Sequence, residues 1–328
     1  MRRAPFSLRA LNTALLLWCL PTCLPGQGRP AAQDAALFLL LPVGARAAGL
    51  GHATVAASGN AEAAWWNPAG LASIARGEAS LNHSQSIIGT SDALVVALGS
   101  PLGVFALSAN VLDYGGGEVT GTDSVPSGNL YPRNIALGAS YAVRIGRDIR
   151  VGANYKLVQF RFDCSGECPT LPTVLASTTA FDLGVQYDLP TRLPIHLGAA
   201  VRNLGVKIQE KDLSADELPS RVQVGASVSY ALPHSFAENA KVMVAVDLID
   251  ELRVKNPLPR VGAEFAWEDA VFLRGGYVLE ARGTESGGAS LGIGFALRRL
   301  TIDFARSVSG LSADAGQPPA YLSLRVRF

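Results

Sequence analysis

The chain has 328 residues and a formal net charge of +1; 48% of its residues are hydrophobic and 17% are charged. Its mean hydropathy of +0.23 is high for a soluble protein, yet it has no run of about 18 apolar residues that would form a membrane-spanning helix. The near-neutral charge argues against nucleic acid as a partner, because proteins that bind nucleic acid carry a basic surface.

Residues 1–28 have the pattern of a secretory signal peptide. Three arginines precede a short apolar stretch, Leu11–Leu20, and prolines and glycines follow it near a small-residue cleavage site. Removing residues 1–28 leaves 25 basic and 27 acidic residues, a net charge of −2. Cys19 and Cys23 allow a lipoprotein alternative, but they are not preceded by the small residues that lipoprotein signals use. We expect an exported protein.

From residue 78 onward, short segments alternate between apolar residues and small or polar ones. Residues 222–230, for example, place valine, alanine and tyrosine on one phase and glutamine, glycine and serine on the other. A period of two is that of a β-strand, whereas a helix would scatter these residues around its axis. We therefore expect an all-β fold of about fourteen strands. The expected spans are 78–86, 92–100, 103–114, 133–144, 149–163, 178–188, 194–204, 221–231, 240–250, 259–267, 270–279, 287–297, 299–309 and 319–328.

The connection lengths favour a transmembrane antiparallel β-barrel over residues 78–328. Links after even-numbered strands are mostly short, and links after odd-numbered strands are mostly longer and polar. Outer-membrane barrels have an even number of strands, short periplasmic turns and long external loops. Four aromatic residues lie on the apolar face of their strands, near the ends that are joined by short links. Such a position is expected of an aromatic girdle at the periplasmic interface. They are Tyr141, Tyr187, Tyr230 and Trp267.

The last strand ends in Phe328 and resembles the signal by which barrel-assembly machinery recognises its clients. That machinery and the lipid bilayer are therefore expected partners. A secreted, soluble β-sandwich that acts as a binding module is the alternative fold, since its strands alternate too. The residues that alternate with the apolar ones, which we call the second phase, are largely Gly, Ser, Ala, Asn and Gln. This composition suits a narrow polar lumen better than the outer face of a sandwich.

Charged residues also fall on this second phase, and we expect five of them among the groups that face the lumen: Asp182, Arg202, Asp247, Arg274 and Asp303. Because buried charges need partners, a structural role is favoured over a ligand-binding role for them.

No pattern in the sequence indicates catalysis, a metal site or a cofactor, so we expect a protein that is not an enzyme. Gly288–Gly292 matches the Gly-x-Ser-x-Gly nucleophile elbow, but Ser290 lies within an alternating strand and no histidine follows it. Cys164 and Cys168 have three residues between them, which in an exported chain favours a small loop disulfide over a metal site. The third option is that Cys164 and Cys168 are not bonded to each other.

Residues 29–77 precede the expected barrel and do not alternate. They contain Gly-Ala-Arg-Ala-Ala-Gly-Leu-Gly at 44–51 and Trp-Asn-Pro-Ala-Gly-Leu at 66–71. Asn67 and Pro68 fit the cap and the first position of a short helix.

The two motifs resemble the N-terminal signature of the PorV/PorQ family, which is related to FadL-type long-chain fatty-acid transporters that share an Asn-Pro-Ala box. Residues 203–205, 218–228, 273–277 and 302–305 are also similar to this family. The resemblance implies a fourteen-stranded barrel with an internal hatch formed by residues 36–76. The hatch residues that match the motifs are Arg46, Trp66, Asn67, Pro68, Ala69 and Gly70.

The resemblance leaves two functions open. The first is movement of small hydrophobic compounds across the bacterial outer membrane, which implies an apolar pocket near the hatch and the external mouth. The second is docking of exported protein clients, as in the type IX secretion branch of the family, which implies that the external loops carry the partner contacts. Neither function requires a cofactor.

Overall fold

The computed structural model describes residues 35–57, 59–120, 126–166, 173–208, 216–233, 238–251, 257–279, 288–308 and 318–328. The expected signal peptide, residues 1–28, lies outside these residues. None of the helices within the described ranges is long and apolar enough to cross a membrane.

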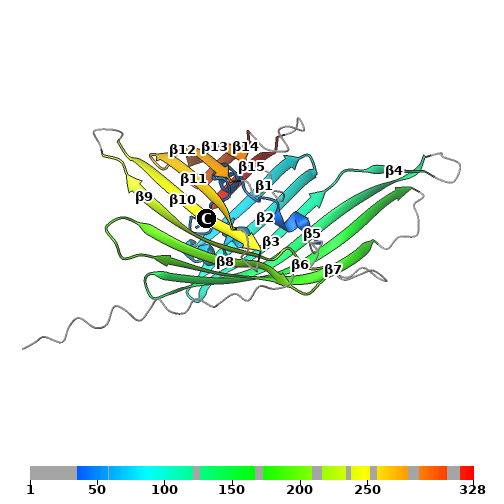
Figure 1. Ribbon diagram of the computed structural model, residues 1–328, viewed down its shortest axis with the longest axis horizontal. Helices are drawn as coiled ribbons and strands as arrows, with labels where there is room; N and C mark the ends of the chain where they lie inside the picture. Colours follow the sequence, from blue (N-terminus) through cyan, green and yellow to red (C-terminus); the bar gives the residue numbers. More distant parts are fainter. Residues whose placement is uncertain are drawn as a thin grey trace, which may run out of the picture. The chain divides into compact units, whose positions relative to one another are not determined.

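The described strands form one antiparallel sheet in which fourteen of them close into a barrel (Figure 1). Strands adjacent in the sequence pair with each other, β3 pairs with β5, and β1 pairs with β15 to close the ring. The expected number of barrel strands is thus confirmed. Their bounds are β1 (Gly77–Ser86), β2 (Gly89–Ser100), β3 (Gly103–Asp113), β5 (Pro126–Ile145), β6 (Ile149–Gly166), β7 (Val174–Asp188), β8 (Ile195–Gly205), β9 (Arg221–Ala231), β10 (Ala240–Glu251), β11 (Leu258–Trp267), β12 (Val271–Val278), β13 (Gly288–Leu297), β14 (Leu300–Ser307) and β15 (Ala320–Arg327).

The largest difference from the expected spans lies between β3 and β5. The sequence predicts a loop there, whereas an additional strand, β4 (Gly117–Thr120), pairs with β5, which begins already at Pro126. β6 and β7 are likewise longer than expected, reaching Gly166 and beginning at Val174. This part of the wall therefore extends further at the long-loop end than its neighbours (Figure 1).

Charged side chains on the outward face stabilise the pairing of β3, β5 and β6 next to these extensions. Nε of Arg133 on β5 donates to Asp113 of β3 at 2.7 Å, and its Nη1 donates to Asp163 of β6 at 3.0 Å. Opposite charges on neighbouring strands stabilise their pairing. These three residues lie inside the expected strands, and what the expectation missed is the continuation beyond them, residues 126–132 of β5 and 164–166 of β6, where apolar alternation fades.

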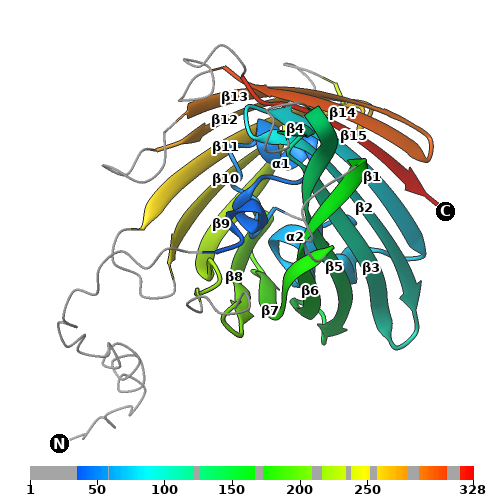
Figure 2. The ribbon, with the colours of Figure 1, turned by 90° about the vertical axis from the view of Figure 1, so that its right-hand side faces the viewer.

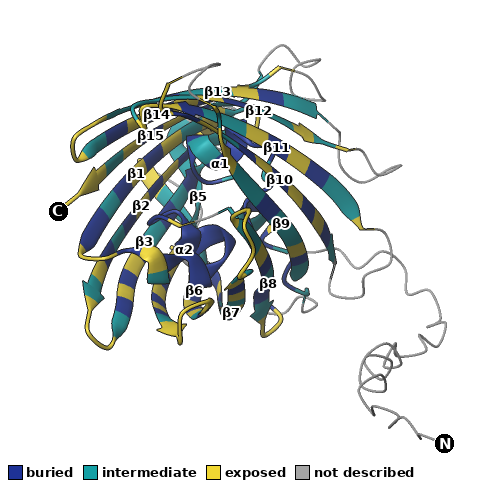
Figure 3. Cartoon of the chain, turned by 90° about the vertical axis from the view of Figure 1, so that its left-hand side faces the viewer, coloured by how far each residue is buried: buried dark blue, intermediate teal, exposed yellow. Residues whose placement is uncertain are grey.

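Side chains alternate between the two faces of the wall, which Figure 3 shows as bands of different burial along each strand. In β9, Val224 on the outward face is 44% exposed, whereas Gln223 beside it is fully buried. The four expected girdle aromatics are all exposed, and all five expected lumen charges are buried.

Residues 35–76, which we call the plug, lie inside the barrel, and Figure 2 shows α1 and α2 surrounded by strands. The plug contains four short helices, η1 (Leu37–Leu40), α1 (Ala45–Gly49), α2 (Ala63–Trp66) and η2 (Pro68–Ser73). α1 contacts β12 to β15, and η2 contacts β3, β5, β6 and β7. The two ends of the plug are therefore held by different parts of the wall.

Candidate functional site

Asn67 joins the plug to itself and to the barrel wall. Its side chain is fully buried and caps η2 by accepting from the backbone N–H of Ala69 at 3.1 Å, with Pro68 at the first helical position. Its Nδ2 donates to the backbone carbonyls of Val55 in the plug (2.7 Å) and of Val185 in β7 (3.2 Å). One amide thus fixes two turns of the plug against the wall.

Glycines form the part of the wall on which the plug backbone lies. A Cβ atom added at Gly184 would overlap Oδ1 of Asn67, and one added at Gly276 would overlap the backbone N of Gly51. No side chain larger than hydrogen fits at these positions unless the plug moves. The wall glycines that meet the plug in this way are Gly152, Gly184, Gly198, Gly262 and Gly276.

We expect Gly276→Ala to lower the free energy of unfolding by about 1–3 kcal/mol, the usual cost of forcing an extra methyl into a packed site. Gly275→Ala is the matched control, because its Cβ would point outward, with Leu291 Cδ2 as its nearest neighbour at 3.9 Å. Urea unfolding of the two purified variants would compare them. Equal effects would show that the plug does not rest on Gly276.

A chain of five alternating charges connects the plug to β11, β12, β14 and β15. Arg46 of the plug donates to both carboxylate oxygens of Glu264, at 3.0 and 3.1 Å. Glu264 also accepts from Arg274 at 2.6 Å, and Arg274 donates to Asp303 at 2.7 Å. Arg325 completes the chain by donating to Asp303 at 2.9 Å. The structure thus places the expected residues Arg274 and Asp303 in one ion pair that reaches Arg46 through Glu264.

Three titratable plug residues have their pKa values set by burial and by these charges. Burial alone would lower the pKa of Arg46, but Glu264 outweighs it and raises the pKa. Burial raises the pKa of Glu62, whose Oε1 has no hydrogen-bond partner among the described residues. Burial, together with Arg260 and Arg202, lowers the pKa of His52 well below its usual value. His52 is therefore neutral at pH 7.

Asp182 organises a second polar cluster at a β-bulge between β7 and β8. It accepts from Nζ of Lys156 at 2.9 Å, from Nδ2 of Asn154 at 3.0 Å and from the backbone N–H of Asn203 at 2.8 Å. Asn203 has φ +58°, and the pairing register shifts at Asp182. Asn154 also donates to the carbonyl of Ala64 at 3.3 Å, which connects the cluster to the plug.

Arg202 and Asp247 contact the plug directly. Nη1 of Arg202 donates to the carbonyl of Trp65 at 3.1 Å, and its guanidinium lies 5.1 Å from the ring centroid of Trp66. Asp247 accepts from the backbone N–H of Val55 at 2.8 Å. Arg202 and Asp247 thus touch the plug themselves. Asp182 reaches it through Asn154, and the pair of Arg274 and Asp303 reaches it through Glu264.

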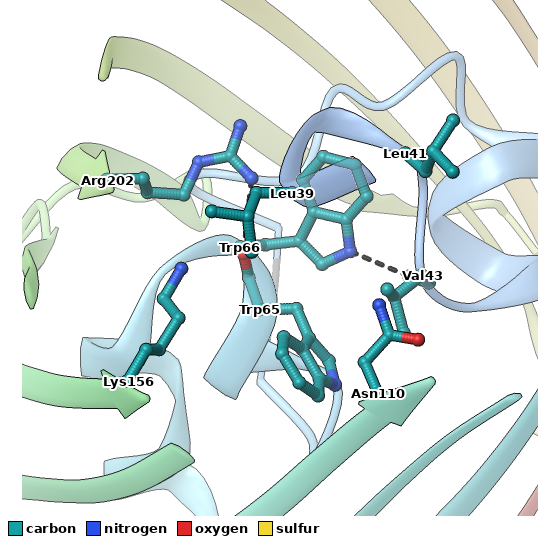
Figure 4. Close-up of a pocket in the computed structure, with 8 residues that line it drawn as sticks. All are labelled: Leu39, Leu41, Val43, Trp65, Trp66, Asn110, Lys156 and Arg202. Carbon is teal, nitrogen blue, oxygen red and sulfur yellow. Dashed lines mark hydrogen bonds between the residues drawn. The ribbon is translucent and has the colours of Figure 1, made fainter. Parts of the chain in front are cut away.

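A small cavity lies beside the two tryptophans of the plug (Figure 4). Its volume is about 20 Å³, roughly the space that one water molecule needs. The indole N–H of Trp66 donates to the carbonyl of Val43 at 2.8 Å, which fixes one side of the cavity. The lining residues are Leu39, Leu41, Val43, Trp65 and Trp66 from the plug and Asn110, Lys156 and Arg202 from the wall.

This cavity faces the long-loop end of the barrel. Asn110 and Arg202 each lie three residues before the end of a strand that runs toward the long loops. Further apolar side chains pack there, including Phe38 of the plug, whose ring meets Phe160 of β6 edge-on at 6.4 Å. The plug therefore presents an apolar surface toward the long loops.

Two larger cavities lie on the other side of the plug, with volumes of about 350 and 260 Å³. They share Arg46, Gly59, Asp269 and Phe272, and Asp269 belongs to the short turn between β11 and β12. Their linings carry charged residues such as Arg325 and Lys241. The plug thus separates a small cavity at the long-loop end, lined by aromatic and aliphatic plug residues together with Lys156 and Arg202, from two larger cavities at the short-turn end.

The remaining expected residues lie near the ends of strands. Cys164 in β6 is disulfide-bonded, but Cys168 is outside the described residues, so their pairing stays a prediction. The backbone N–H of Phe328 donates to the carbonyl of Gly77 at 3.0 Å beside the β1–β15 seam. Its role as an assembly signal stays a prediction. Within the described ranges, no three His, Cys, Asp or Glu side chains come together as metal ligands would.

Sequence reasoning missed Glu264, Lys156 and Arg325, which hold the expected charges in place. Each lies on the inward phase of an expected strand, so the alternation itself was the signal that could have identified them. The alternation does not predict which inward charges pair with each other, because the partners lie on different strands.

No protein-family model and no curated protein sequence matches this chain. Several solved structures share its fold. The CymD monoaromatic hydrocarbon channel is 13% identical with a TM-score of 0.57, covering 88% of this chain and 98% of that one. A Pseudomonas aeruginosa FadL homologue is 14% identical with a TM-score of 0.51 (88% and 99% covered). The P. putida toluene transporter TodX is 11% identical with a TM-score of 0.52 (87% and 98% covered). The chain therefore has the barrel fold of FadL-type channels.

Proposed function

We propose that this protein is an outer-membrane channel for small hydrophobic compounds and that the plug is its gate, closed in this structure. The observation that carries the proposal is the position of the plug, which is seated on wall glycines between the small cavity at the long-loop end and the two larger cavities at the short-turn end. A compound that enters from the long-loop end meets the aromatic and aliphatic side chains of the plug first and has to displace the plug to pass.

The outward face of the barrel supports a membrane location. On β5, the outward residues between Arg133 and Tyr141 are Ile135, Leu137 and Ala139. Eight residues of a tilted strand span about 20 Å, close to the roughly 25 Å apolar band of outer-membrane barrels. The ion pairs of Arg133 would then mark the external boundary, and the tyrosine would belong to the periplasmic girdle.

The chemistry of the cavity beside Trp65 and Trp66 supports a hydrophobic substrate. The plug contributes only aromatic and aliphatic side chains to its lining, as in pockets for small apolar ligands, while the wall contributes Asn110, Lys156 and Arg202. At about 20 Å³, the cavity is far too small for an aromatic ring. Binding therefore has to be coupled to movement of the plug. The shared fold of channels for monoaromatic hydrocarbons agrees with this substrate class.

The competing function, docking of exported protein clients, rests on the likeness of residues 44–51 and 66–71 to the PorV/PorQ signature. In the channel proposal the same residues have a physical role. Gly51 lies against the wall and Asn67 fixes the plug, and neither role requires a protein partner.

We expect Asn67→Ala to increase entry of a hydrophobic probe such as toluene about tenfold in cells without other hydrophobic channels. The variant loses the hydrogen bonds from Asn67 to the wall carbonyls of Val185 at 3.2 Å and Ala199 at 3.5 Å. At about 0.5–1.5 kcal/mol each, their loss would raise the open population by roughly that factor. Asn134→Ala is the matched control, because its side chain bonds Tyr114 and does not touch the plug.

Both variants should still migrate faster on a denaturing gel when unheated, as folded barrels do. Unchanged entry of the probe with an intact barrel would contradict the gate. If the Asn67 variant instead lost retention of an exported protein client at normal probe entry, client docking would replace the proposal.

A further inference from the structure

Four exposed arginines lie close together at the short-turn end of the barrel, where β14, β15 and β1 are neighbours (Figure 3). The backbone N–H of Arg327 donates to the carbonyl of Arg299 at 2.9 Å. The backbone N–H of Phe328 donates to the carbonyl of Gly77, the residue after Arg76, at 3.0 Å. Because neighbouring strands are about 4.8 Å apart, the four arginine backbones lie within about 15 Å of one another. We call the group the arginine rim; its members are Arg76, Arg298, Arg299 and Arg327.

The arginine rim has few acidic neighbours. Within the part of the chain that the structure describes, none of the four side chains makes an ion pair or a hydrogen bond. Glu78, opposite Arg327 in the register, accepts from the backbone N–H of Ala61 in the plug at 2.7 Å. Four positive charges are thus balanced by at most two negative ones, those of Glu78 and of the carboxylate at the end of the sequence. At the external boundary, in contrast, Arg133 pairs with acids on both neighbouring strands.

Two of the four arginines occupy a turn that does not require them. Leu297 pairs with Leu300, which leaves Arg298 and Arg299 as a two-residue hairpin loop. Such loops favour Asn-Gly or Asp-Gly. Arg298 has φ +55°, a backbone conformation that bulky residues rarely adopt. A residue kept in an unfavourable conformation points to a use for its side chain.

Exposed apolar side chains lie directly beside the arginine rim. Leu297 is 74% exposed, Leu98 is 53% exposed and Phe328 is 48% exposed. Gly77 pairs with Leu98, and the ring of Phe328 lies against Gly77, since a Cβ atom added there would overlap the ring. A ligand that contacts both the arginines and these side chains has to carry an anionic group and apolar chains.

We propose that the arginine rim is a binding site for an anionic phospholipid of the inner leaflet of the outer membrane. A planar guanidinium donates two parallel hydrogen bonds to phosphate oxygens. The acyl chains lie against Leu98, Leu297 and Phe328. Short turns on the periplasmic side place the arginines at the depth of the inner-leaflet headgroups, so this inference rests on the proposed membrane location. Basic residues next to a membrane-spanning segment attract anionic lipids in this way.

Native mass spectrometry of the full-length protein in mild detergent tests the proposal, with equal amounts of phosphatidylglycerol and phosphatidylethanolamine of the same acyl chains. Both lipids carry a phosphate, but only phosphatidylglycerol has a net negative charge. We expect phosphatidylglycerol to bind about tenfold more tightly. Glycerol phosphate, which has no acyl chains, is the soluble competitor and should not displace the lipid at equal concentration.

Arg76→Gln with Arg299→Gln removes two charges from the arginine rim and should weaken binding of phosphatidylglycerol about tenfold. Arg147→Gln with Lys241→Gln is the matched control. It removes two charges from the same end of the barrel, in the turn between β5 and β6 and at the start of β10. Binding should be unchanged in this control. Faster migration of the unheated samples on a denaturing gel verifies that both variants are folded.

Equal binding of the two lipids by the folded protein, or an equal loss in both double variants, would overturn the proposal. Displacement by glycerol phosphate at equal concentration would overturn it as well and would assign the arginines to soluble phosphate compounds. Recovery of the protein outside the membrane would contradict the proposed function itself, and this inference with it.

Discussion

Asp303→Ala is expected to lower the free energy of unfolding by about 3–5 kcal/mol, the range observed when one partner of a buried ion pair is removed. Asp303 is fully buried and accepts from both Arg274 and Arg325. Its loss leaves Arg274 to share Glu264 with Arg46 and removes the carboxylate to which Arg325 donates. Urea unfolding of the purified protein would measure the change.

Asp269→Ala is the matched control for this prediction. Asp269 pairs with Lys241 at 2.7 Å, but the two side chains are 66% and 53% exposed. Exposed ion pairs contribute at most about 1 kcal/mol. A loss in the Asp303 variant no larger than in the Asp269 variant would show that the charge chain does not hold the plug and the wall together.

Val224→Lys should cost about 2–4 kcal/mol of stability in a lipid bilayer, because it places a charge on the lipid face away from either interface. Val224→Leu, which keeps the position apolar, should have little effect. Tyr230→Lys lies on the same face of β9 but next to its periplasmic end, where the cost falls to about 0–1 kcal/mol. Equal costs for the two lysine variants would contradict the proposed depth of β9 in the membrane.

The alternation in β9 also suggests Gln223→Lys as a mild, lumen-facing control, but the surroundings of Gln223 lead us to expect a larger cost. Gln223 is fully buried, donates to Asp247 at 2.7 Å and accepts from Arg202 at 3.3 Å. A lysine there would face Arg202 in a space without water. The pattern predicts which way a side chain points, but not whether the lumen at that point is filled.

Barrel strands were predictable from the sequence because lipid on one side and a small, polar interior on the other impose a period of two. That constraint ends where the wall leaves the proposed membrane. β4 and the residues of β5 before Arg133 therefore escaped prediction. The cap formed by Asn67 and Pro68 was predictable because it depends only on neighbouring residues.

The seat of the plug could not be predicted from the sequence. Glycines on the inward face are expected in any narrow lumen. The local sequence does not distinguish Gly276, which contacts Gly51 of the plug, from a glycine that only leaves space in the lumen. Close approach between backbones more than 200 residues apart is a property of the folded barrel. For the same reason the pairing of Arg46 with Glu264 became visible only in three dimensions.

Tethering the plug to the wall tests the gate most directly. The backbone N of Ala45 in the plug lies 2.7 Å from Oγ of Ser323 in β15, so a protein with Ala45→Cys and Ser323→Cys should form a disulfide between them. We predict that the oxidised protein, with its cross-link verified by mass spectrometry, admits no more toluene than cells without the channel. Reduction should restore entry, and a Ser323→Cys single variant should not respond to either treatment. Undiminished entry through the fully cross-linked protein would contradict the claim that the plug is the gate.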